Sequence, residues 1–110
     1  MSERTEALAN EAIQRYEAST TTWLETYQRK EEIDQEVEDR KLDTEVMATE
    51  QSPTATGVAP LKKRMLAEDP NYQGALQKQK MYKYDLLRAE HAMDVAKMQA
   101  WLRINLAKHE

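Results

Sequence analysis

The stretch "QSPTATGVAP" (residues 51–60) interrupts a chain whose composition otherwise favours helix. Pro53, Gly57 and Pro60 stand there among small polar residues, a composition that favours turns and does not continue a long helix. The residues from 3 to about 50 contain neither glycine nor proline. A break of this length between two helical segments predicts that the chain reverses direction, as it does in an antiparallel helical hairpin.

The segments on either side carry helix start signals. Ser2 and the acidic Glu3 and Glu6 suit the N-terminus of the first helix, where partial positive charge gathers. Asp69 followed by Pro70 is typical of an N-cap and first helical position. We expect a single all-α domain over 1–110, with its parts in this order: a helix over about 3–50, a linker over 51–60, a short helical turn over 61–68 and a helix over about 70–108.

The composition limits the classes of protein. One third of the residues are charged, two are glycine and none is cysteine. This usage is typical of long helices, and it excludes disulfides and thiolate metal sites. No apolar run approaches the roughly 20 residues that a membrane helix needs, so we expect no membrane association and a cytoplasmic location, the host cytoplasm if a phage encodes the chain.

The helix over 70–108 has two apolar stripes. One contains Leu76 and Leu87, with part of it repeating every 11 residues, and the second contains Leu86 and Met93. A helix that is apolar on two faces needs several neighbours, which predicts a homo-oligomer. The predicted oligomer interface consists of Leu86, Leu87, Met93, Val95, Met98, Trp101, Leu102 and Ile104.

No pattern indicates catalysis or a cofactor. His91 is in phase with an apolar stripe, and His109 is terminal, so no set of convergent ligands or acid–base partners is recognisable. The acidic run 31–45 lacks the glycine turn of an ion-binding loop, which favours a solvated helix face. We expect no enzymatic activity, no cofactor and no metal.

Charge is unevenly distributed along the chain. The net charge is −4, yet residues 1–50 carry 14 acidic and 6 basic side chains, whereas residues 51–110 carry 6 acidic and 10 basic ones. Cations interleaved with tyrosine rings suit a nucleic-acid single strand, because cations follow phosphates and rings stack on bases. The same cations could instead neutralise the acidic first helix. The predicted nucleic-acid contacts are Lys62, Lys63, Arg64, Lys78, Lys80, Tyr82, Lys83 and Arg88.

The layout of the chain resembles a known family. The segments "YEASTTTWLETYQRKEEID" (16–34), "LKKRMLAEDPNYQGALQKQKMYKYDLLRAE" (61–90) and "MQAWLRINLAKHE" (98–110) resemble those of phage UvsY-type recombination mediators. The resemblance implies a ring-forming helical hairpin that helps to load a recombinase onto single-stranded DNA.

Two functional hypotheses follow. The first is a non-enzymatic phage-type accessory protein that binds single-stranded nucleic acid and whose partners include a recombinase. The second is a protein–protein interaction module, such as a scaffold, an adaptor or an inhibitor of a host or defence protein. Such a module would use the acidic face over 31–45 or the double-striped helix.

Overall fold

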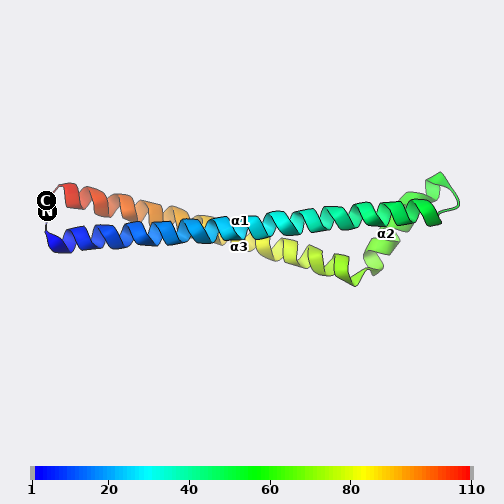
Figure 1. Cartoon of the computed structure of the whole chain (residues 1–110), viewed down its shortest axis with the longest axis horizontal. Coiled ribbons are helices and arrows are strands. Elements are labelled where there is room, and N and C mark those ends of the chain that lie inside the picture. Colours follow the sequence, from blue (N-terminus) through cyan, green and yellow to red (C-terminus); the bar gives the residue numbers. More distant parts are fainter. Residues whose placement is uncertain (1, 110) are drawn as a thin grey trace. The chain divides into compact units, whose positions relative to one another are not determined.

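The computed structural model describes residues 2–109 and confirms the all-α prediction for them. Helix α1 (Glu3–Gln51) is followed by a short 3₁₀ turn, η1 (Ala55–Gly57), and by α2 (Val58–Glu68) and α3 (Pro70–Lys108) (Figure 1). No strand occurs in the described part of the chain. Within that part, no helix combines the length and the apolar character needed to cross a membrane.

Helix α1 continues for 49 residues without interruption. Its first turn is capped by Ser2, whose Oγ accepts a hydrogen bond from the Thr5 backbone N–H at 3.2 Å. Inside the helix, threonine hydroxyls donate to the carbonyl four residues earlier, which satisfies them without an outside partner. These threonines are Thr20, Thr21, Thr22, Thr26, Thr44 and Thr49.

The break after α1 is shorter than the sequence predicts. Helix α2 begins at Val58, three residues before the start of the expected turn, and spans 11 residues. Pro60 is its third residue, and the first N–H groups of a helix have no intrahelical partner, so proline is tolerated there. Thr54 caps η1, because its Oγ1 accepts the Gly57 backbone N–H at 3.2 Å.

Asp69 and Pro70 form the corner between α2 and α3. The Asn71 backbone N–H donates to Asp69 Oδ1 at 3.0 Å, the N-cap that the sequence predicts. Gln73 Nε2 donates to the Leu66 carbonyl at 3.1 Å and so satisfies the end of α2. Both ends of the corner are therefore capped by side chains.

The helices divide into two compact units, each described by itself. The loop unit is residues 29–83, and it buries Ile33 and Val37 of α1 against Tyr72 and Ala75 of α3. Leu66 of α2 packs against this cluster, and so do Leu76 and Tyr82 of α3. All three helices thus contribute to one small apolar core.

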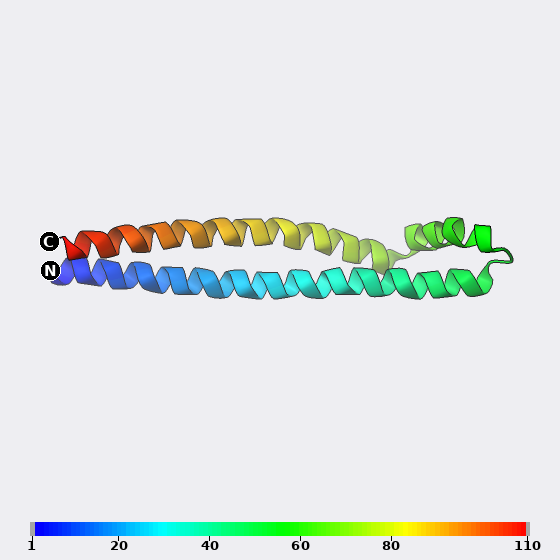
Figure 2. The same ribbon diagram turned by 90° about the horizontal axis from the view of Figure 1, so that it is seen from above.

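The terminal unit comprises residues 2–28 and 84–109 of the described chain. Figures 1 and 2 show its two helical segments side by side and antiparallel, with both chain ends at the same end. Its buried apolar side chains are all alanines, Ala9 and Ala12 from α1 and Ala89, Ala96, Ala100 and Ala107 from α3. We call this alanine-lined contact the alanine seam.

Candidate interaction surface on helix α3

Large apolar side chains line the side of α3 that the terminal unit leaves uncovered. Met98 and Trp101 are each 63% exposed, and Tyr84 is 61% exposed. Most of the exposed apolar residues along this helix are separated by three, four or eight residues, which keeps their side chains on one side of the helix. We call this surface the outer α3 face, made of Tyr84, Leu87, Val95, Met98, Trp101, Leu102 and Leu106.

The second apolar stripe of α3 lies toward α1. Ala96 and Ala100 are buried on it, and Leu86, Met93 and Ile104 are half-buried. The predicted oligomer interface therefore splits in two. Its exposed members are Leu87, Val95, Met98, Trp101 and Leu102, whereas Leu86, Met93 and Ile104 share the side of the helix that holds the alanine seam.

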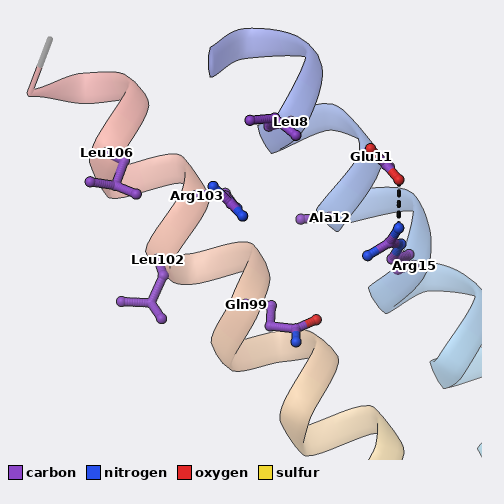
Figure 3. Close-up of a pocket in the computed structure, with 8 residues that line it drawn as sticks. All are labelled: Leu8, Glu11, Ala12, Arg15, Gln99, Leu102, Arg103 and Leu106. Carbon is purple, nitrogen blue, oxygen red and sulfur yellow. Dashed lines mark hydrogen bonds and ion pairs between the residues drawn. The ribbon is translucent and has the colours of Figure 1, made fainter. Parts of the chain in front are cut away.

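A groove lies between the helices near the chain ends, and it opens beside the outer α3 face. Its apolar lining is Leu8 and Ala12 from α1 with Leu102 and Leu106 from α3. Figure 3 shows Leu8 pointing toward α3 and Arg103 pointing toward α1. The polar lining consists of Glu11, Arg15, Gln99 and Arg103, and Arg15 Nη2 pairs with Glu11 Oε1 at 2.6 Å.

The charges beside the outer α3 face change sign along the helix. Residues 84–94 carry three acids and one base, whereas residues 97–108 carry three bases and no acid. The one base of the first half, Arg88, forms an exposed ion pair of 3.4 Å with Asp85. Because one base cannot balance three acids, the first half keeps a net negative charge and the second half a net positive charge.

The cations predicted to bind nucleic acid lie in different surroundings. Arg88 belongs to the terminal unit, and the other seven predicted residues belong to the loop unit. Lys62 Nζ lies 3.6 Å from Glu45 Oε2, and Lys78 lines a depression together with Glu32 and Glu36. Lys62 thus has an acidic partner, whereas Lys78 lies near acidic side chains without an ion pair among residues 2–109.

Tyr82 and the remaining cations differ from one another in exposure. Tyr82 is half-buried and packs against the core of the loop unit, which leaves less of its ring for base stacking. Besides Lys78, four of the predicted cations are exposed and take part in no ion pair among residues 2–109, namely Lys63, Arg64, Lys80 and Lys83.

The acidic run of α1 is organised by contacts within the helix. Arg40 pairs with Glu36 at 3.1 Å, and Lys41 pairs with Glu38 at 3.3 Å. Lys30 Nζ donates to Asp34 Oδ2 at 2.7 Å, and Gln79 Nε2 of α3 donates to Asp34 Oδ1 at 2.8 Å. These two hydrogen bonds, first that of Lys30 and then that of Gln79, lower the pKa of Asp34 because they favour its charged form.

No metal-ligand arrangement occurs in the part of the chain that the structure describes. Within residues 2–109, no three His, Cys, Asp or Glu side chains come together in a way that would hold an ion. Comparisons with protein-family models, curated proteins and solved structures find no significant match to this chain.

Proposed function

We propose that this chain is a non-enzymatic protein–protein interaction module, an antiparallel hairpin of α1 and α3 that self-associates through the outer α3 face. The observation that carries the proposal is the exposure of seven large apolar side chains along one side of one helix. Exposed apolar surfaces of this extent on soluble proteins mark interaction sites.

The energetics favour the same proposal. Fully burying a Val, Leu or Met side chain contributes about 1.5–3 kcal/mol, whereas an alanine offers only its single methyl group. The terminal unit fully buries only alanines and leaves Leu87, Met98 and Leu102 exposed, so these three side chains contribute little hydrophobic stabilisation within one chain. Association with another copy would bury those side chains and stabilise a unit that has only two helical segments of its own.

Light scattering coupled to size-exclusion chromatography tests the proposal. The double variant Val95→Glu/Met98→Glu places two charges in the middle of the outer α3 face and should reduce the particle mass to that of one chain, 12.8 kDa. Leu42→Glu is a matched control, because Leu42 is 58% exposed on α1 and outside this face. It should keep the wild-type mass, and a double variant of unchanged mass would contradict the proposal.

A second candidate function is sequence-tolerant binding of single-stranded nucleic acid. The observation that favours it is the exposure of four unpaired cations, Lys63 and Arg64 on α2 and Lys80 and Lys83 on α3. The resemblance to recombination mediators would then extend to activity, and the assembled module would act as an accessory protein for a recombinase on single-stranded DNA.

Titration of a fluorescent oligo-dT strand at several salt concentrations tests this second function. Each phosphate contact to a single strand contributes about −0.7 to the slope of log K against log salt, so Lys63→Ala/Arg64→Ala should reduce the slope by about 1.4. Arg40→Ala/Lys41→Ala is the control, because both side chains are already paired with glutamates. Absence of binding at low salt would exclude this function.

A further inference from the structure

The outer α3 face has a repeat that is symmetric about one residue. Tyr84 and Leu106 each lie 11 residues from Val95, one on either side. Eleven residues correspond to about three turns of a straight helix, so all three side chains keep the same direction. A two-fold axis at Val95 would therefore pair Val95 with its own copy and Tyr84 with the Leu106 of a second chain.

The charges along the helix distinguish the two possible directions of pairing. The acids Asp85, Glu90 and Asp94 precede the centre, and the bases Lys97, Arg103 and Lys108 follow it. Parallel pairing would place acids beside acids and bases beside bases, which is unfavourable. Antiparallel pairing places the acidic half of each chain against the basic half of the other, so that charge complementarity selects this direction.

The groove near the chain ends fits the same arrangement. Leu102 and Leu106 line it, and under a two-fold axis at Val95 Leu106 lies opposite the Tyr84 of the second chain, with Leu102 about one helical turn away. Tyr84 is the large ring at the other end of the face and is 61% exposed. Its ring would enter the apolar part of the groove, while Gln99 and Arg103 offer hydrogen-bonding partners for its hydroxyl.

We infer that the occupant of the outer α3 face is a second copy of this chain, bound antiparallel with the two-fold axis at Val95. This inference rests on the proposed self-association and specifies its geometry. Such an interface uses the same surface on both copies, so it closes on itself and does not extend into fibres.

Disulfide cross-linking tests the geometry, since the chain has no cysteine of its own. A disulfide requires Cα atoms about 4.4–6.8 Å apart. Under oxidising conditions Val95→Cys should cross-link to itself. Tyr84→Cys alone and Leu106→Cys alone should not, but their mixture should give the cross-linked pair. Leu42→Cys, outside the face, is the control and should stay unlinked.

The outcomes separate this inference from the proposed function. If each of the three single-cysteine variants cross-linked to itself, the antiparallel geometry would be wrong. It would also be wrong if the Val95→Cys variant formed a dimer by mass but gave no disulfide. Either result would leave self-association intact. A mass of one chain for the unmodified protein under the same conditions would overturn both.

Charge-reversal substitutions provide a second, independent test of the antiparallel geometry. Asp94→Lys and Lys97→Glu should each raise the dissociation constant by about 2- to 10-fold, and the double variant should restore it. Additive weakening in the double variant would argue against contact between Asp94 and the Lys97 of the second chain.

Discussion

The loop unit and the terminal unit bury different kinds of side chain. The loop unit encloses Ile33, Val37 and Tyr72, and Asp34 joins α1 to Gln79 of α3 through a hydrogen bond. In the terminal unit the buried apolar side chains are alanines, whereas seven larger ones are exposed along the outer α3 face and others, such as Leu86 and Ile104, are half-buried. The two units thus differ in what they bury, although the loop unit also exposes some large apolar side chains, among them Leu42 and Met81.

Alanines have a structural consequence at this position. A small side chain allows two helix backbones to approach closely, but it contributes little apolar area. The segments of α1 and α3 can therefore pair without covering both stripes of α3. The remaining stripe is the surface that the second copy would occupy.

The largest expected effect concerns the core of the loop unit. Ile33 is 5% exposed, so Ile33→Ala should destabilise the protein by about 2–5 kcal/mol through lost burial and a residual cavity. Urea unfolding followed by circular dichroism measures the change. Leu42→Ala on the same helix is the control and should change stability by less than about 0.5 kcal/mol. Equal effects of the two substitutions would remove the distinction between a packed loop unit and an open surface.

A second substitution tests whether the alanine seam is tightly packed. Ala100 is 5% exposed, and Ala100→Leu should destabilise the terminal unit by about 1–3 kcal/mol because the larger side chain forces the helices apart. Ala92→Leu adds the same side chain at an exposed position of α3 and should be nearly neutral. Amide hydrogen exchange can locate the loss in residues 2–28 and 84–109. Unchanged protection in the Ala100→Leu variant would mean that the seam is loose.

The loop unit can also be stabilised without altering its packing. Gly74 lies inside α3, and no atom lies within 4 Å of a Cβ added there. Gly74→Ala should therefore raise the free energy of unfolding by about 0.4–1 kcal/mol, because alanine has less freedom to lose on folding. A lower urea midpoint for this variant would show that the position is more crowded than the structure indicates.

The smallest expected effect is the pH dependence due to Asp34. Because its pKa in the folded chain is lowered from 3.8, its contribution to stability is present above pH 3.8 and is lost as the pH falls through the lowered value. Thermal unfolding between pH 2 and 6 should show a shallower acid loss for Asp34→Asn than for the wild type. Identical profiles would show that the contacts with Lys30 and Gln79 do not persist in solution.

The all-α class is predictable from the sequence because glycine and proline gather at one break and helix caps stand at the right positions. Ser2 and Asp69 are such caps, and the structure shows both in use. The two stripes of α3 are likewise visible in the sequence. The start of α2 is not, because Pro60 signals a break and yet is compatible with the first turn of a helix.

The sequence does not show which stripe of α3 is covered. That choice depends on α1, whose buried positions include Ala9, Ala12 and Thr26. A prediction of the buried face that relies on large apolar residues does not detect a contact made by such small side chains. The sequence also does not predict that Lys62 pairs with Glu45 or that Gln79 bonds to Asp34, because these contacts depend on how the helices of the loop unit are aligned in space.

Sedimentation equilibrium of the unmodified chain over a wide concentration range tests the central claim most directly. If the outer α3 face binds a second copy, the measured mass should rise with concentration to at least twice the 12.8 kDa of one chain. A mass of 12.8 kDa at every concentration would contradict the account, since the exposed apolar face would then have no partner of its own kind.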